Sequence, residues 1–308
     1  MNWNDCPNLI FHDISGCFDH PNYIEICTKD IKVVSSSICQ NCPEFKKLNI
    51  KSRLQEHYNT ALTLFPEKQI VGLWLQGSQN YNLDTKTSDI DTKLIVVPTL
   101  DDMIFLREPR SHTHILPNGE HLDYKDIRLY PNTLRKQNLN FVEILFTDYF
   151  IVNPLYEDLW NKWVDARELI GRYCEMATIK SMRGQVLNKM HTYKLPSNDN
   201  RIAAIEKYEY DPKELSHAIR FEYFIRKFLN GEAYIDCMRP DGETTQYIRS
   251  VKSGRYNLQE AEYIMETQIK DIVKVCDNYI DSNETIKSAY VDQLLDSVQK
   301  DVVERAIS

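Results

Sequence analysis

Short apolar runs alternate with helical patterns in the first half of the chain, and helical patterns alone fill the second half. Apolar residues recur at helical spacing over 46–66, and the runs 71–76 and 89–97 have the length of strands. A third strand is expected over 121–130, and amphipathic helices from 155 onward. We therefore expect an α+β fold, with a sheet-containing domain over 48–154, a helical domain over 155–308 and a small cap over 1–47.

Length and composition agree with a globular protein of two domains. The chain has 308 residues, 42% of them hydrophobic and 27% charged, and a single core rarely grows far beyond about 250–300 residues. No apolar run is long enough for a transmembrane helix, and the N-terminus lacks the features of a signal peptide. We expect a cytoplasmic location and no membrane partner. The net charge of −8 argues against a protein that coats nucleic acid by bulk charge.

Two carboxylates and a Gly-Ser pair suggest phosphate chemistry. Asp89 and Asp91 are spaced so that on a strand both would point to the same side, where they would repel each other without a cation. Mg²⁺ suits such a pair, because it leaves its other positions to water and phosphate. Gly77-Ser78 ends the preceding strand, and a glycine there lets backbone N–H groups approach an anion. The pattern predicts phosphoryl or nucleotidyl transfer; a solvated turn before a strand is the alternative.

The arrangement of Gly77-Ser78 and Asp89-Ile90-Asp91 resembles the signature of the DNA polymerase beta nucleotidyltransferase superfamily. That family carries a third carboxylate on a later strand, and Asp126 in the segment DIRLYP resembles it. Asp123 lies three residues earlier, on the opposite face of a regular strand, and is the second choice.

The resemblance implies a polymerase beta-like fold with a mixed sheet, and it implies a role for each motif residue. Asp89 and Asp91 would bind two magnesium ions. Asp126 would bind the metal at the acceptor hydroxyl and accept its proton. Gly77 and Ser78 would hold the β- and γ-phosphates of a nucleoside triphosphate.

The segment NLNFVEIL is similar to a motif of stand-alone nucleotidyltransferases of bacteria and phages, which are related to the RNA-ligase-associated polymerase-like group. Asn138, Asn140 and Glu143 stand at the motif positions, and Leu139 replaces the usual proline. Glu143 is either a residue on a helix face or a group that supports the metal ligands. The resemblance implies transfer of a nucleoside monophosphate to a hydroxyl with release of pyrophosphate, and it names an RNA 3′ end as one acceptor.

Two basic stretches of the helical half are candidates for phosphate binding. The segment YDPKELSHAIR resembles a helix of the same family, in which Lys213, His217 and Arg220 share one helix face and would bind the nucleotide. Lys180 and Arg183 belong to a second basic helix. For that helix, a solvated face and a phosphate-binding face remain equally open.

Five of the eight cysteines fall within the first 42 residues. Cys39 and Cys42 have the spacing of half a zinc site, and Cys17 and Cys27 would complete four thiolates. A cysteine-rich cap with this little apolar material would be ordered by zinc. The alternative is a loop-rich cap with free thiols.

Two other functions remain open from the sequence. One is nucleotidylation of a protein or a small molecule by the same site. The other is a module that binds RNA or a partner and whose transferase site is vestigial. Three carboxylates in the expected pattern argue against a vestigial site.

Overall fold

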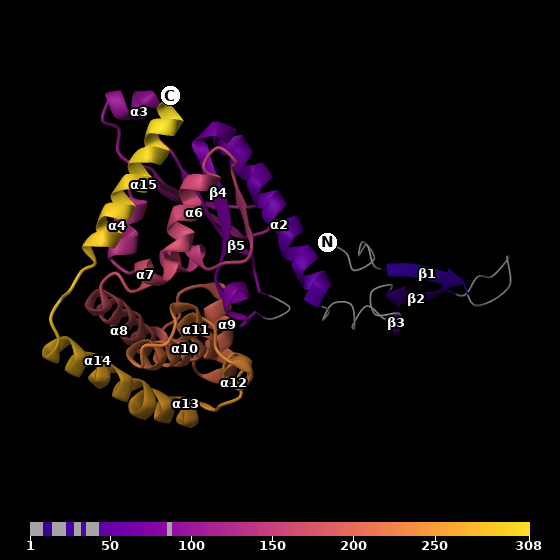
Figure 1. Ribbon diagram of the computed structural model, residues 1–308. Helices are drawn as coiled ribbons and strands as arrows, with labels where there is room; N and C mark the ends of the chain where they lie inside the picture. Colours follow the sequence, from indigo (N-terminus) through magenta and orange to yellow (C-terminus); the bar gives the residue numbers. More distant parts are fainter. Residues whose placement is uncertain (1–8, 14–22, 28–31, 35–42, 85–87) are drawn as a thin grey trace. The chain divides into compact units, whose positions relative to one another are not determined.

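The computed structural model describes residues 9–13, 23–27, 32–34, 43–84 and 88–308 (Figure 1). By its internal contacts the chain divides into two compact units, Met1–Leu64 and Phe65–Ser308. The domain boundary that we predicted at residue 154 falls inside the second unit.

The first unit contains a small antiparallel sheet and one long helix. Strands β1 (Leu9–Asp13), β2 (Tyr23–Cys27) and β3 (Lys32–Val34) pair in that order. Helix α2 (Pro43–Leu64) covers the helical pattern expected over 46–66, and Pro66 follows its end. Cys17, Cys39 and Cys42 lie outside the described residues. Cys27 ends β2, but its side chain is not described. The zinc site therefore stays a prediction.

A five-stranded mixed sheet organises the second unit. Its order is β6 (Ser111–Ile115), β7 (His121–Asp126), β5 (Asp91–Val96), β4 (Ile70–Gln76) and β8 (Phe150–Val152). The pair β5–β7 is parallel and the other pairs are antiparallel. The expected α+β class with a mixed sheet is confirmed. Strand β6 lies within a segment, 107–120, whose two prolines and Asn-Gly turn favour loop structure.

Hydrophobicity explains which strands are central. Strand β4 is buried from Ile70 to Leu75, and β5 from Thr92 to Val96, so both faces of these strands are buried and their sequences are nearly continuous apolar runs. Strand β6 is mostly exposed and occupies an edge, where its alternating polar residues can face water.

Helices make up most of the rest. After the 3₁₀ turn η3 (Ser78–Tyr81), they are α3 (Leu100–Ile104), α4 (Tyr130–Arg135), α5 (Leu139–Val142), η4 (Glu143–Leu145), α6 (Glu157–Asp165), α7 (Arg167–Gly171), α8 (Glu175–Thr192), α9 (Asp199–Tyr208), α10 (Pro212–Leu229), α11 (Tyr234–Met238), α12 (Gly242–Lys252), α13 (Leu258–Ile264), α14 (Lys270–Ser282) and α15 (Ala289–Ile307). Within the described residues, no helix has the length and apolar character that crossing a membrane requires.

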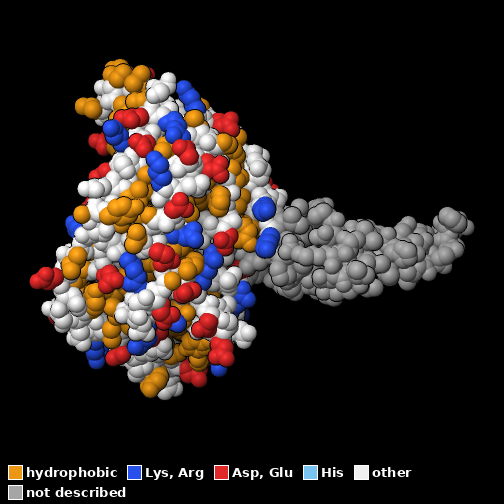
Figure 2. Space-filling view, in the orientation of Figure 1, with side chains coloured by type: hydrophobic (Ala, Val, Ile, Leu, Met, Phe, Trp, Pro, Cys, Tyr) orange, Lys and Arg blue, Asp and Glu red, His pale blue; other side chains and the backbone are white. Residues whose placement is uncertain are grey.

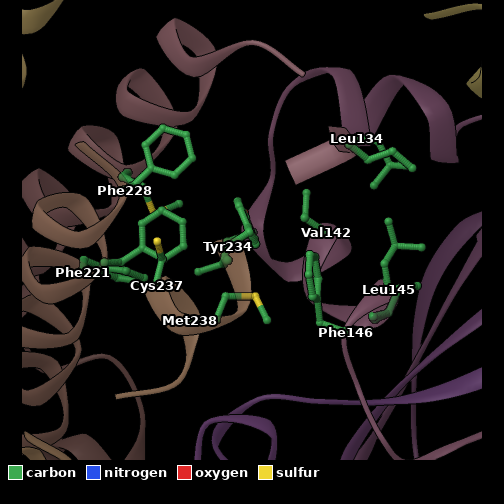
Figure 3. Close-up of a cluster of buried hydrophobic side chains, with 14 of the residues drawn as sticks. Leu134, Val142, Leu145, Phe146, Phe221, Phe228, Tyr234, Cys237 and Met238 are labelled. Carbon is green, nitrogen blue, oxygen red and sulfur yellow. The ribbon is translucent and has the colours of Figure 1, made fainter. Parts of the chain in front are cut away.

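A continuous hydrophobic core joins the sheet to the helices of the second unit. It runs from Val71 on β4 to Val302 on α15. Figure 3 shows one part of this core, where Phe146 of the sheet side meets Tyr234 of α11; their rings stack with centroids 5.2 Å apart. Because the same core serves both sides, the sheet and the helices hold each other in fixed positions.

The C-terminal helix strengthens this connection. Helix α15 packs against α6 and α4, beside the sheet (Figure 1). Arg135 of α4 contacts Asp292 and Asp296 of α15 at 2.6 Å each. A segment at the end of the chain thus stabilises the half that contains the Asp and Gly-Ser motifs.

Candidate functional site

A cleft of about 610 Å³ lies in the second unit, where the ends of β4, β5 and β7 face helices α8, α10 and α12. The sheet side contributes the motif residues Gly77, Ser78, Asp89 and Asp91. The helical side contributes four cationic residues, Lys189, Lys213, Arg220 and Lys252. The other residues of this side are Gln185, Asn200, Ser216, His217, Phe221 and Ile248.

The Gly-Ser turn begins where β4 ends. Gly77 has φ +83°, a left-handed conformation that a residue with a side chain rarely adopts. The carbonyl of Gly77 accepts a hydrogen bond from the Asn80 N–H at 3.0 Å. The Asn80 side chain donates to the Leu75 carbonyl at 2.7 Å and accepts from the Thr147 hydroxyl at 2.6 Å. These bonds fix the turn at the edge of the cleft, as the sequence predicted.

Asp89 and Asp91 both line the cleft, although only Asp91 belongs to β5. The expected reason for their proximity, adjacent positions on one face of a strand, therefore applies only in part. Asp91 accepts a hydrogen bond from the His121 N–H at 3.0 Å. Burial raises the pKa of Asp91, and the neighbouring charge of Asp89 raises it further. The pair thus carries negative charge that its surroundings do not fully compensate.

Asp126 is not in this cleft, which corrects our choice of the third carboxylate. It pairs with Val96 at the far end of the parallel β5–β7 ladder and is fully buried. Its carboxylate accepts bonds from the backbone N–H and the guanidinium of Arg128, at 2.9, 3.0 and 2.8 Å. Asp126 therefore holds the chain at the end of β7.

Asp123 occupies the cleft instead. It is the register partner of Lys93 on β5, and Lys93 lies two residues after Asp91, on the same face of the strand. The sequence places Asp123 and Asp126 on opposite faces of one strand, but only the register decides which face meets Asp91.

The Asp123 carboxylate already accepts hydrogen bonds from neighbouring side chains, one of which is a lysine. Its Oδ2 accepts from Lys93 Nζ at 2.8 Å and from Gln76 Nε2 at 3.3 Å, and its Oδ1 accepts from the Thr113 hydroxyl. Burial alone would raise the pKa of Asp123, but the bonds from Lys93 and Thr113 and the Lys93 charge bring it below its ordinary value. Asp123 is therefore less basic than a free carboxylate. We did not predict Lys93 as a site residue, although its position two residues after Asp91 indicates that both side chains lie on the same face of the strand.

Glu143 lies at the floor of the cleft and is 2% exposed. The N–H of Gly77 approaches its Oε1 at 3.4 Å, and its Oε2 has no hydrogen-bond partner within the described residues. Burial raises the pKa of Glu143 to about 8, against the opposing effect of the Arg220 charge. Both roles left open by the sequence, a residue on a helix face and a group that supports the metal ligands, stay predictions; the structure adds that the side chain is buried at the cleft.

Helix α10 brings its three predicted residues, Lys213, His217 and Arg220, to the cleft. The Arg220 guanidinium lies 4.0 Å from the Tyr81 ring centroid and 4.9 Å from that of Phe221. Its Nε is buried and has no hydrogen-bond partner within the described residues. Burial lowers the pKa of Arg220 to about 10.

His217 differs from our expectation of three cations. Burial lowers its pKa well below the ordinary value, and the charges of Arg220, Lys189 and Lys213 add to this effect. The imidazole is therefore neutral at pH 7, and it offers a hydrogen bond rather than a charge.

Two further lysines line the cleft: Lys189 belongs to the basic helix that the sequence predicted, and Lys252 was not a candidate. Lys189 of α8 contacts Glu214 at 3.1 Å, which neutralises much of its charge. Lys252 of α12 donates to the Leu83 carbonyl at 3.2 Å. Burial and the Lys213 charge lower the pKa of Lys252.

The structure places Lys180 and Arg183 elsewhere, although both belong to α8. Arg183 pairs with Asp277 of α14 at 2.5 Å, and Lys180 lines a different pocket near the start of the helix. Neither residue lines the cleft with the other predicted residues, and their role in phosphate binding stays a prediction. The same helix instead directs Gln185 and Lys189 to the cleft, because helical rotation carries 180 and 183 to other faces.

Asp89 and Asp91 fit a magnesium ion by their chemistry. They supply hard oxygen ligands, lie together in an open cleft, and carry incompletely compensated charge. Within the described residues, no three His, Cys, Asp or Glu side chains converge on a ready-made metal site. Magnesium needs only one or two carboxylates when a phosphate completes its coordination shell. Asp89 and Asp91 therefore supply enough carboxylates for such a site.

In comparisons with known proteins, no protein-family model matches the chain, and no curated protein matches it. A functional assignment therefore rests on the geometry of the cleft.

Proposed function

We propose that this protein transfers a nucleoside monophosphate from a nucleoside triphosphate to a hydroxyl acceptor and releases pyrophosphate. The observation that supports this function best is the opposition of charges across one cleft, with Asp89 and Asp91 on the sheet side and Arg220 and Lys213 on the helical side. A triphosphate needs both. Cations on the protein meet its oxygens directly, and a pair of carboxylates meets it through Mg²⁺.

In the proposed reaction, a bond forms between the acceptor oxygen and the α-phosphorus. The bond from that phosphorus to the oxygen shared with the β-phosphate breaks, and pyrophosphate leaves with that oxygen. Magnesium held by Asp89 and Asp91 would stabilise the charge on the attacking and leaving oxygens.

The Gly77 turn, Arg220 and Glu143 surround the place that we assign to the leaving pyrophosphate. Arg220 is held by the rings of Tyr81 and Phe221 and has an unpartnered Nε–H to offer a phosphate oxygen. Glu143 has a pKa of about 8 and is therefore protonated at pH 7. Its Oε2, which has no hydrogen-bond partner among the described residues, can then donate a hydrogen bond to an anion that a carboxylate would repel.

In this proposal Asp123, rather than Asp126, is the third carboxylate beside the acceptor hydroxyl, and its role is smaller than the one we expected for Asp126. Because Lys93 lowers its basicity, we assign it to orient the acceptor hydroxyl by accepting its hydrogen bond. The proton then leaves to water in the open cleft.

The test is transfer of label from each α-labelled nucleoside triphosphate in the presence of Mg²⁺, with cellular RNA, protein and small-molecule fractions offered separately. We expect Asp89→Asn and Asp91→Asn to lower the rate by roughly a thousandfold or more, since several kcal/mol of charge stabilisation are lost. Both variants should remain folded, because the change relieves repulsion between the two carboxylates.

Asp101→Asn is the matched control, because Asp101 is an exposed aspartate on α3 and is not among the residues that line the cleft. It should leave transfer unchanged. The fraction that takes up label identifies the acceptor. If no fraction is labelled with any of the nucleotides, or if Asp91→Asn transfers at the normal rate, the proposed function is wrong.

A further inference from the structure

A second pocket, of about 580 Å³, lies near the start of α8 and is lined by basic residues. Arg135, Lys136, Lys180 and Lys287 line it, and none of its described lining residues is acidic. The whole chain is acidic, with a net charge of −8, and over the face shown in Figure 2 acidic and basic side chains are interspersed. We call this the basic pocket.

Two of its four cations, Lys136 and Lys180, have no acidic partner among the described residues. Arg135 contacts Asp292 and Asp296, and the Lys287 charge helps to lower the pKa of Asp292. The side chains of Lys136, Lys180 and Lys287 are exposed and form no hydrogen bond or close ion pair with any residue that the structure describes. Separate lysines on a surface are commonly just solvated, but three around one concavity raise its potential and attract an anion.

Two elements contribute residues to both the basic pocket and the cleft. On α8, Ser181 lines the basic pocket and Gln185 lines the cleft; residues four apart share a helix face. Beside α8, Asn138 lines the basic pocket and Asn140 lines the cleft. Lys180 and Lys189 are about 13 Å apart along the helix axis at the usual helical rise.

Gly184 lies on α8 between the two lining segments. It is exposed, and a side chain at this position would meet no atom within 4 Å. A glycine within a helix costs about 1 kcal/mol relative to alanine. Helix α8 therefore has an exposed position without a side chain between the residues that line the basic pocket and those that line the cleft.

We propose that a single-stranded polynucleotide is the acceptor and that it lies along α8. Its phosphodiesters contact Lys136, Lys180 and Lys287, and its terminal hydroxyl reaches Asp89 and Asp91. This inference rests on the proposed function and narrows its acceptor. A repeated charge along an extended ligand explains cations beyond the cleft, where a small acceptor or the nucleotide itself would not extend.

The first experiment measures binding of a short fluorescent RNA to the full chain over a range of salt concentrations, without nucleotide, with a DNA of the same sequence in parallel. The double variant Lys180→Gln/Lys287→Gln should bind the RNA roughly tenfold more weakly. Loss of two phosphate contacts should reduce the steepness of the salt dependence by roughly 1.4. Lys300→Gln is the matched control, because Lys300 is an exposed lysine on α15 outside both linings. It should change neither quantity.

The second experiment uses Gly184 to separate position from charge. Gly184→Gln and Gly184→Glu have side chains of the same size, and either removes the helix penalty of glycine. We expect both to weaken RNA binding, the Glu variant more strongly because its charge repels phosphate, and we expect nucleotide binding to stay unchanged. A difference between the two variants in RNA affinity supports contact with a charged ligand at this site.

The results separate the two proposals. If Asp91→Asn abolishes transfer, but the lysine pair and Gly184→Glu change neither RNA binding nor the KM for a polynucleotide acceptor, the inference is wrong and the proposed function stands. Transfer to protein or to a small molecule alone would also overturn it. If RNA binds through the lysines, but no labelled nucleotide is transferred, the site along α8 stands and the proposed function fails. Equal binding of RNA and DNA would assign recognition to the phosphodiester backbone; tighter binding of one would add its sugar, and both outcomes support the proposal.

Discussion

Asp126 and Glu143 are both buried carboxyl groups of the same unit, and their surroundings differ in every other respect. Asp126 is enclosed by Arg128, which donates from its backbone and its guanidinium. Glu143 has one long contact from the Gly77 N–H and one oxygen without a partner in the described part of the chain. The charge of Arg220 acts on Glu143, and the Arg220 Nε likewise has no partner among the described residues.

The difference indicates which buried charge belongs to the scaffold and which to a site. A buried polar group without a partner costs stability, so its persistence calls for a ligand that satisfies it. A buried carboxylate with three close donors needs no ligand. Strongly perturbed groups in a cleft are functional candidates for this reason. By this criterion Glu143 and Arg220 belong to the site, and Asp126 belongs to the scaffold.

The largest expected effect concerns the pH dependence of stability at Glu143. Its pKa is about 8 in the folded state and 4.5 ordinarily. The folded state therefore holds a proton that the unfolded state has lost, and stability falls as pH rises from about 4.5 to about 8. The total loss is on the order of 4 kcal/mol. Glu143→Gln should remove this loss, as measured by urea unfolding at several pH values.

Glu214→Gln provides the control with the opposite sign. Glu214 is buried too, but its hydrogen bond from Thr192 and the Lys189 charge lower its pKa despite the effect of burial. Its contribution is present above its ordinary pKa and is lost as pH falls through the lowered folded value. The Gln variant should therefore be less stable than wild type at pH 7. If the stability of Glu143→Gln falls between about pH 4.5 and 8 as much as that of wild type, the raised pKa of Glu143 is not the cause of the loss. The contrast that we draw with Asp126 is then wrong.

The second expected effect is the loss of stability in Asp126→Ala. Removing this carboxylate leaves the Arg128 guanidinium, 16% exposed, without its buried partner. We expect the free energy of unfolding to fall by about 3 kcal/mol. Replacing both residues, as in Asp126→Leu/Arg128→Met, should restore part of it. Nucleotide binding by the folded fraction should be normal. A stable Asp126→Ala protein that fails to transfer label would return Asp126 to the site.

The smallest expected effect is on nucleotide affinity in Arg220→Ala. The loss of a charge-assisted hydrogen bond to phosphate costs about 1.5–3 kcal/mol, which is roughly ten- to a hundredfold in Kd. Lys213→Ala should cost less, because Lys213 is exposed and lacks a planar guanidinium. Calorimetric titration with a nucleoside triphosphate measures both.

Arg226→Ala is the control, since Arg226 lies on the same helix but pairs with Glu222 and Asp271 outside the cleft. It should leave nucleotide affinity unchanged. A lower melting temperature in Arg220→Ala with unaltered nucleotide affinity would make Arg220 a structural residue, and the contrast with Asp126 would disappear.

Local signals predicted the parts of the site that are close in sequence. Gly77-Ser78 and the pair Asp89 and Asp91 were found because a strand, a tight turn and a second strand bring them to one edge within a short stretch of chain. Lys213, His217 and Arg220 were found because helical spacing alone puts them on one face. The charge of His217 could not be predicted, since its neutrality depends on burial and on cations from other helices.

The differences between the predicted and the observed lining of the cleft have one physical origin. Asp126 was preferred to Asp123, and Lys180 and Arg183 to Gln185 and Lys189. In each case we predicted the strand or helix correctly. We did not predict which of its faces, or which position along it, meets the cleft. A strand offers two faces and a helix several, and the partner that selects among them is distant in sequence.

The sequence by itself determined strands β4, β5 and β7, the helical character of the second half, the α+β class, the Gly-Ser turn and the aspartate pair, because these follow from patterns over a few residues. Only the tertiary structure decided which carboxylate of β7 joins Asp91, since the parallel register with β5 sets this. It also decided that Glu143 is buried beside Arg220, and that α8 turns Lys189 and Lys180 toward different pockets. Burial and register are properties of distant segments in contact, and no local pattern contains them.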